Sequence, residues 1–534
     1  ISTAGSLLAL LSFPFLIEPY IPLSDERAIW LGAFLVYALL AAIITYVQSS
    51  SIGAPKQEVS EKASWIDRAE WVLYSALPSV LLVSATTILT QSLTSVPLLW
   101  IVPLALYLLT FVISFSGRGT SIFWPLLVLI AAYFVLKNTP STALGVLEQS
   151  IAYISFLFIG SLFCHAYLYR MRPSTQLLPA FYLYVAFGGV IGTIFGSLLS
   201  PMLFTGFFWE FPISVGLVSV LAALALSAEL FPRFMSDRGI GLAKILISLG
   251  LIVSLSLIMY KARPDEVVIK SRNFYGPAEV ILRDDANVLM HGTTMHGMQV
   301  KDPEWEHVPT TYYSVASGVG RAMAYTRDML GRQDARVAVI GLGTGSMASY
   351  CTGDDSFVFY EIDSRILDIA NEHFTYLSAC EGSDVRIGDG RKLLESELAS
   401  GIAGAYDVLV VDAFSDDSIP VHLVTKEAVE LYFAHLRDDS SMVAIHTSNR
   451  YLALSPVLLR IARELDLNVM IVQDAGDATQ FAVSSQWVLL TKDDTALLTD
   501  AFSEVTWEMP ESLPPLWTDD YTSVYSVIKP FVAW

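Results

Sequence analysis

Four apolar runs in the second half of the chain each lead into residues that could take part in chemistry. The first run, 337–340, is followed by three closely spaced glycines, Gly341, Gly343 and Gly345. The next three runs lead to the acids Glu361, Asp389 and Asp412. Such glycines let the backbone approach a nucleoside, and an acid about 20 residues further on can accept hydrogen bonds from the ribose hydroxyls. The order of these residues predicts a nucleoside-binding site.

The elements that must position these residues alternate between strands and helices. The sequence predicts strands at 336–341, 357–362, 384–387, 406–412, 441–447, 468–472 and 487–490. Helices are expected between them, for example at 364–374 and 456–465. This alternation is typical of βαβ units with a parallel sheet, in which ligands bind at the carboxyl ends of the strands. We therefore expect the four strand ends to converge.

Convergence gives each acid a role. Glu361 is placed for the ribose diol, Asp389 for the adenine amino group and Asp412 for the reacting end of the ligand. The alternative reading is that all three are ordinary turn residues. A small antiparallel β unit should precede this sheet, because short alternating runs lie at 266–270, 278–283 and 287–290.

The first half of the chain is much more apolar. The whole sequence is 54% hydrophobic with a mean hydropathy of +0.53, which is too apolar for an ordinary soluble enzyme. Candidate membrane spans lie at about 4–22, 28–48, 70–91, 95–116, 121–137, 145–169, 177–200, 204–229 and 240–260. Glycines recur between 188 and 196 at a spacing that favours close helix packing. Four polar residues in these runs could line a pathway or bond to neighbouring helices: Glu18, Glu148, His165 and Glu210.

Charge separates the two halves. Residues 1–264 contain 13 Lys and Arg against 11 Asp and Glu, whereas residues 265–534 contain 19 against 41. An acidic soluble half argues against nucleic acid as a partner. The three cysteines form no CxxC pair, so no disulfide framework and no zinc or other metal site is expected, which suits a reducing compartment.

The orientation signals conflict. With nine spans, most Lys and Arg residues fall on the side opposite to the soluble domain, and the positive-inside rule then places that domain outside the cytoplasm. A nucleoside cofactor is expected inside. We give the chemistry precedence, and predict a multi-pass protein of the inner (cytoplasmic) membrane with a cytoplasmic catalytic domain.

The soluble half resembles a known family. The strand-end residues, together with 273–276 (NFYG) and 291–299 (HGTTMHGMQ), resemble the spermidine synthase (polyamine aminopropyltransferase) family, and particularly membrane-fused spermidine synthase-like proteins of bacteria. The resemblance covers about 270–490. It implies a homodimer and a nucleoside substrate, S-adenosylmethionine or its decarboxylated form. It also implies that Asp412 takes a proton from the attacking amine, and that these residues bind the cofactor: Gln299, Gly341, Gly343, Thr344, Gly345, Glu361, Asp389 and Gly390.

The acceptor end departs from the family pattern. Thr344 stands where the family has an aspartate, and the loop 412–420 is longer. The segment 309–314 (PTTYYS) replaces the family's Asp-Glu-x-x-Tyr-His, so that Tyr312 or Tyr313 is expected in the tyrosine's role. Candidate substrate contacts are Asp416, Asp417 and His296, with further acidic support from Asp519 and Asp520.

Four functions stay open at this point. The first is aminopropyl transfer to an amine, such as a polyamine precursor, with release of methylthioadenosine. The second is a lyase or cyclase that acts on S-adenosylmethionine without an acceptor. The others are a membrane transporter or sensor that only binds the nucleoside, and ordinary methyl transfer.

The predicted architecture has three parts. A multi-pass α-helical membrane domain of about 8–9 spans occupies 1–262, and a small β unit with a linker helix occupies 263–325. An α/β Rossmann-like domain, similar to class I S-adenosylmethionine-dependent transferases, occupies 326–534.

Overall fold

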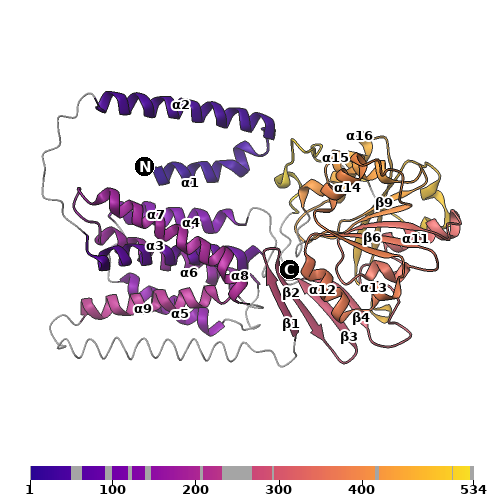
Figure 1. Cartoon of the computed structure of the whole chain (residues 1–534), viewed down its shortest axis with the longest axis horizontal. Coiled ribbons are helices and arrows are strands. Elements are labelled where there is room, and N and C mark those ends of the chain that lie inside the picture. Colours follow the sequence, from indigo (N-terminus) through magenta and orange to yellow (C-terminus); the bar gives the residue numbers. More distant parts are fainter. Residues whose placement is uncertain are drawn as a thin grey trace. The chain divides into compact units, whose positions relative to one another are not determined.

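The computed structural model divides into two compact units, with most residues up to Arg263 in the first and those from Pro264 onward in the second (Figure 1). The structure describes residues 2–49, 63–90, 99–117, 123–138, 146–204, 208–230, 268–291, 294–414, 420–507, 509–510 and 512–529. The predicted boundary between the helical and the β-containing parts, 262/263, lies outside the described residues.

The described part of the first unit is helical. Five of its helices are long and apolar enough to cross a membrane: Leu23–Val47, Trp65–Ile88, Glu148–Arg170, Leu178–Leu203 and Glu210–Ser227. The shorter apolar helices are Ser2–Ile17, Ile101–Phe115 and Phe123–Leu136. The predicted span at 240–260 lies outside the described residues. By length and composition these helices are compatible with a membrane protein.

The bounds of the individual helices follow the predicted spans. In order they are α1 (Ser2–Ser12), η1 (Phe13–Ile17), α2 (Leu23–Ser49), α3 (Trp65–Ile88), α4 (Ile101–Phe115), α5 (Phe123–Asn138), α6 (Val146–Arg170), α7 (Leu178–Ile194), η3 (Phe195–Leu199), α8 (Ser200–Leu203) and α9 (Glu210–Leu230).

The glycines of α7 pack directly against α3. A Cβ placed on Gly188 would lie 2.5 Å from the Val72 carbonyl oxygen, and one on Gly192 would lie 2.3 Å from that of Ala76. Larger side chains would force the two helices apart. The predicted close packing at this stripe is therefore confirmed.

The second unit begins with a four-stranded antiparallel sheet, β1 (Val268–Asn273), β2 (Gly276–Leu282), β3 (Ala286–His291) and β4 (Thr294–Val300), in that order. The sequence predicted the first three strands. The fourth was missed because its residues, TMHGMQV, lack a clear alternation of apolar and polar side chains.

A seven-stranded mixed sheet follows, with the spatial order β10-β11-β9-β8-β5-β6-β7. Its strands are β5 (Arg336–Ile340), β6 (Ser356–Glu361), β7 (Ser383–Ile387), β8 (Val408–Val411), β9 (Met442–His446), β10 (Asn468–Asp474) and β11 (Ser485–Thr491). All seven were predicted. The pairs that join β7, β6, β5, β8 and β9 are parallel, whereas β11 is antiparallel to both of its neighbours. This is a doubly wound, Rossmann-like sheet.

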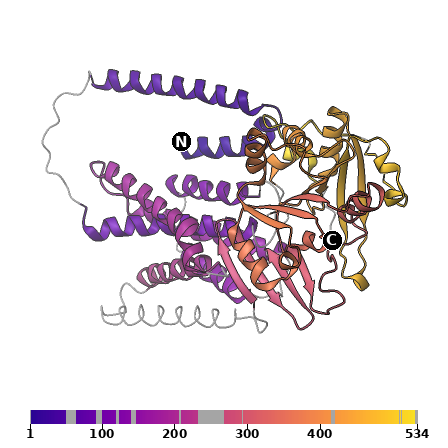
Figure 2. The same ribbon diagram turned by 45° about the vertical axis from the view of Figure 1, so that its right-hand side comes forward.

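Helices cover both faces of this sheet (Figures 1 and 2). On one face pack α11 (Gly318–Ala324), α12 (Ser364–His373) and α13 (Tyr376–Ala379). On the other face pack α14 (Gly390–Ala399), α15 (Lys426–His435) and α16 (Ser455–Glu464). Val337 and Val339 of β5 enter the first core, and Ala338 and Ile340 enter the second. Burial on both faces explains why this strand reads as a continuous apolar run.

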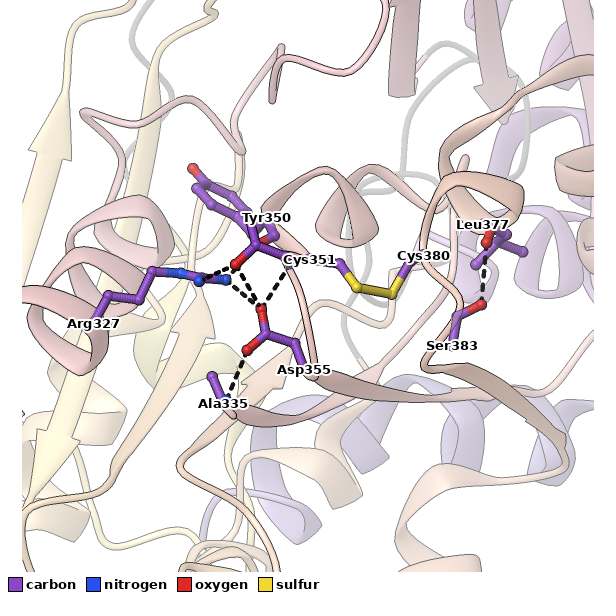
Figure 3. Close-up of a disulfide and its surroundings, with 9 residues drawn as sticks. Arg327, Ala335, Tyr350, Cys351, Asp355, Leu377, Cys380 and Ser383 are labelled. Carbon is purple, nitrogen blue, oxygen red and sulfur yellow. Dashed lines mark hydrogen bonds and ion pairs between the residues drawn. A yellow bond between two sulfur atoms is a disulfide. The ribbon is translucent and has the colours of Figure 1, made fainter. Parts of the chain in front are cut away.

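A disulfide joins Cys351 to Cys380, with 5.7 Å between their Cα atoms (Figure 3). The expectation of no disulfide framework was therefore wrong, because the sequence distance of 29 residues hides the fact that the two cysteines shortly precede the paired strands β6 and β7. The bond ties the segment after the short helix η5 (Ser346–Tyr350) to the end of α13. Beside it, Arg327 pairs with the buried carboxylate of Asp355 at 2.6 Å.

Candidate active site

One pocket lies at the carboxyl ends of four neighbouring parallel strands. Gly341 follows β5, Glu361 ends β6, Asp389 follows β7 and Asp412 follows β8, and all four line it. The sheet reverses its strand order between β5 and β8, which is where doubly wound sheets bind ligands. The structure thus brings the predicted strand ends together.

The glycine turn closes one wall of the pocket. Gly341, Gly343 and Gly345 have φ values of 103°, 55° and 82°, in the region that favours glycine. A Cβ on Gly343 would lie 2.9 Å from the His296 carbonyl oxygen. The turn therefore packs tightly against β4 while its backbone faces the pocket.

Glu361 is buried and holds the turn in place. Its Oε2 accepts a hydrogen bond from the amide of Leu342 at 3.0 Å, and its Oε1 accepts one from the amide of Asp363 at 2.9 Å. Burial raises the pKa of Glu361 to about 7, against the opposing effect of these amides. The carboxylate keeps further lone pairs that could accept from a ribose diol.

Asp389 caps the helix that follows it. Its Oδ1 accepts from the Lys392 amide at 3.1 Å at the start of α14, and its Oδ2 lies 3.3 Å from Nε2 of His422. His422 also lines the pocket, although the sequence did not single it out. Gly390 lines the pocket next to Asp389.

Asp412 lies at the centre of a hydrogen-bonded cluster. The hydroxyl of Tyr313 donates to its Oδ2, and Nδ1 of His446 lies 2.7 Å from its Oδ1. Nε2 of His446 lies 2.8 Å from Oγ of Ser448, and this Oγ accepts from the Gln486 amide at 2.8 Å. Only 4% of the Asp412 side chain is exposed, so the carboxylate is largely screened from water.

Aromatic rings fix the imidazole of His446. The ring of Tyr312 stacks on it with 4.6 Å between centroids, and that of Trp487 does so at 4.7 Å. Phe414 contacts it edge-on at 5.2 Å. These ring contacts restrict the orientation of the imidazole.

The two adjacent tyrosines differ in what their hydroxyls reach. Tyr312 donates to the carbonyl oxygen of His296 at 3.3 Å, whereas Tyr313 donates to Asp412. Burial, and then the negative charge of Asp412, raise the pKa of both hydroxyls well above the usual range, so both stay protonated. Thr311, just before them, has a φ of 57°, which is rare for a β-branched residue.

His296 faces the pocket as a neutral ring. Burial, and then the nearby His291, lower its pKa to about 4. Within the described part of the chain, its buried Nε2 has no hydrogen-bond partner. A ligand could therefore hydrogen-bond with this nitrogen.

Other predicted residues lie outside the pocket lining. The amide of Gln299 donates to the Glu306 carbonyl oxygen at 2.9 Å and to Thr375 Oγ1 at 2.7 Å, so it ties β4 to α13. Thr344 is buried, and its hydroxyl lies 2.6 Å from that of Ser346. Asp519 pairs with Arg391. Asp416 and Asp417 lie outside the described residues.

Sequence reasoning missed His446 and Ser448. His446 ends β9, which the sequence did predict as a strand at 441–447. Because β9 is also a parallel strand, its polar end residue lies at the same edge of the sheet as Asp412. Ser448 could not be found this way, because its contact depends on a turn of the chain after β9. No group of three His, Cys, Asp or Glu side chains in the described ranges is arranged to hold a metal.

Similarity to known proteins is confined to part of the chain. No protein-family model matches it. A stretch of 96 residues is 33% identical to the polyamine aminopropyltransferase of Vibrio vulnificus and covers 17% of this chain. The chain spans only 31% of the length of that relative.

Several solved methyltransferases share a limited structural likeness. A SAM-dependent methyltransferase from Agrobacterium tumefaciens covers 44% of this chain and 79% of its own, at 10% identity and a TM-score of 0.29. An O-methyltransferase from Streptomyces achromogenes, in complex with SAM, covers 33% of this chain and 80% of its own, at 16% identity and a TM-score of 0.25. The sheet is called Rossmann-like because of its strand order, and not because of its similarity to these solved structures, whose TM-scores are low.

Proposed function

We propose that the second unit binds an adenosyl sulfonium and transfers its aminopropyl group to an amine, releasing methylthioadenosine. One observation carries the proposal: the glycine turn and the carboxylates Glu361, Asp389 and Asp412, from four strand ends, line a single pocket. The 33% identity to a polyamine aminopropyltransferase over 96 residues supports the same reading. For aminopropyl transfer the substrate would be the decarboxylated form of S-adenosylmethionine, whereas S-adenosylmethionine itself would be the substrate of the second candidate below.

The roles follow from the chemistry of the groups. Glu361 would accept hydrogen bonds from the ribose diol, and Asp389 one from the adenine amino group. Asp412 would attract a cationic group and take up the proton that an ammonium must lose before its nitrogen can attack. The new carbon–nitrogen bond forms as the carbon–sulfur bond breaks, and the electron pair of the broken bond stays on the sulfur, which becomes a neutral thioether.

A second candidate is a lyase or cyclase that acts on S-adenosylmethionine alone. It is favoured by the engagement of Asp519 with Arg391, which removes one carboxylate expected to support a diamine. The contact of Tyr313 with Asp412 also supplies a pair of groups that could orient the tail of the sulfonium substrate without an acceptor.

A product assay distinguishes these reactions. The purified full-length protein is incubated with S-adenosylmethionine or with its decarboxylated form, each with and without putrescine, and the products are separated by chromatography. Aminopropyl transfer predicts that methylthioadenosine and a polyamine appear together, and only when the decarboxylated form and the amine are both present. Cleavage of S-adenosylmethionine without amine would instead establish the lyase or cyclase, and S-adenosylhomocysteine would indicate methyl transfer.

A further inference from the structure

The hydrogen-bond contacts that described residues make with the Asp412 carboxylate come from side chains that can donate a hydrogen. The carboxylate receives the Tyr313 hydroxyl on one oxygen and faces Nδ1 of His446 with the other. An ionised carboxylate only accepts hydrogen bonds, so Nδ1 must carry a hydrogen for this contact to be favourable. A neutral imidazole has one such hydrogen, and Nε2 is then an acceptor.

The contact made by Nε2, the other ring nitrogen of His446, is consistent with a hydrogen on Nδ1. Nε2 lies 2.8 Å from the hydroxyl of Ser448, which can donate to it. Ser448 in turn accepts from the backbone amide of Gln486, and a backbone amide can only donate. A directed chain of donors thus runs from Gln486 through Ser448 and His446 to Asp412.

Ring stacking also holds this chain of hydrogen-bond donors in place. The imidazole of His446 stacks against the rings of Tyr312 and Trp487, both within 4.7 Å of it and nearly parallel to it. This stacking opposes rotation of the ring away from Asp412. The hydrogen bond is therefore set before any ligand arrives.

We propose that His446 is a positioning residue that holds Asp412 as an oriented anion, so that the carboxylate recognises a positively charged group of the ligand, a sulfonium or an ammonium. The inference deepens the proposed function and rests on it for the identity of the ligand. Hydrogen bonds to charged groups are stronger than neutral ones, and losing one weakens binding by about tenfold to a hundredfold.

Two substitutions separate positioning from packing. His446→Asn places an amide nitrogen close to the position of Nδ1 and keeps a donor toward Asp412, whereas His446→Ala removes it. Both remove the stacked ring, so both should lower thermal stability. His435→Asn is the matched control, because His435 is also buried but its Nδ1 lies 3.0 Å from the Leu431 carbonyl oxygen instead of a carboxylate.

Affinity is measured by titration calorimetry on the full chain with two probes, cationic S-adenosylmethionine and neutral methylthioadenosine. His446→Asn should bind the cation within about threefold of the parent, and His446→Ala should lose about tenfold or more, with little change for the neutral probe. His435→Asn should change neither affinity. Equal losses in both His446 variants, or equal losses for both probes, would overturn the proposal.

The protonated nitrogen of His446 is measured separately. Histidine ¹⁵N shifts of selectively labelled protein, assigned by comparison with His446→Asn, should show the hydrogen on Nδ1. A hydrogen on Nε2 would overturn the donor chain. If the product assay finds no transfer while the tautomer and the affinity pattern hold, the proposed function fails and the role of His446 stands.

Discussion

Gly341 and Asp412 touch across the gap between two strand ends. A Cβ on Gly341 would lie 2.2 Å from the backbone oxygen of Asp412, closer than any side chain could approach. The glycine turn and the central aspartate therefore form one packed unit rather than two independent loops. A side chain in place of the hydrogen of Gly341 would therefore displace both the glycine turn and the backbone that carries Asp412.

Asp412→Asn should abolish turnover without unfolding the protein. The variant keeps the volume of the side chain and removes its charge, so we expect a rate loss of about 100-fold or more. Its melting temperature should stay close to that of the parent. Asp384→Asn, at an exposed carboxylate of the same unit, is the control and should leave the rate unchanged. Retained turnover in Asp412→Asn would place the reaction centre elsewhere.

Tyr313→Phe should lower turnover more than Tyr312→Phe. The first removes a hydroxyl that donates to the Asp412 carboxylate, and the second removes a hydroxyl that donates to a backbone carbonyl oxygen at 3.3 Å. We expect a loss of about tenfold or more for Tyr313→Phe and a smaller one for Tyr312→Phe. Steady-state rates at saturating substrate measure the difference. The reverse ranking would show that the Tyr313 contact has no part in the reaction.

Glu361 should make nucleoside binding depend on pH. Its folded-state pKa of about 7 lies above the ordinary value of 4.5, so it favours the folded state most below pH 4.5, and this contribution is lost as the pH rises through 7. Nucleoside binding should change with pH in the opposite direction, because the ionised carboxylate of Glu361 accepts hydrogen bonds from the ribose hydroxyls. Calorimetric titration of methylthioadenosine at pH 6 and pH 8 should show tighter binding at pH 8. Glu361→Gln should bind weakly at both values, and an unchanged affinity in this variant would remove Glu361 from the site.

Reduction of the disulfide should lower thermal stability. In a chain-entropy estimate, closing a loop of this length stabilises the folded protein by about 3–4 kcal/mol. Melting should therefore shift downward in dithiothreitol for the parent but not for the double variant Cys351→Ser/Cys380→Ser. Labelling the unfolded protein with maleimide should modify only Cys164 before reduction and all three cysteines after it. Three reactive thiols without reductant would show that the bond does not form.

The sequence was sufficient to predict the sheet but not all the partners of the site. Apolar runs and their turns predicted all seven strands, since buried parallel strands have a strong local signal. Glu361 and Asp412 were found because strand ends follow from that pattern. The pairing of Cys351 with Cys380, the engagement of Gln299 and the donor chain through Ser448 depend on contacts between distant segments, which no local pattern encodes.

The antiparallel pairing of β11 with β9 sets the positions of the groups that orient the Asp412 carboxylate. Trp487 is paired with His446 across β11 and β9, and its neighbour Gln486 supplies the amide that starts the donor chain. Because successive residues of a strand face opposite sides, a slip of one residue would remove the stacked indole and misplace the amide together. Substitutions in the β10–β11 hairpin that leave every pocket residue intact can therefore alter recognition of the ligand, through nothing more than the alignment of two strands.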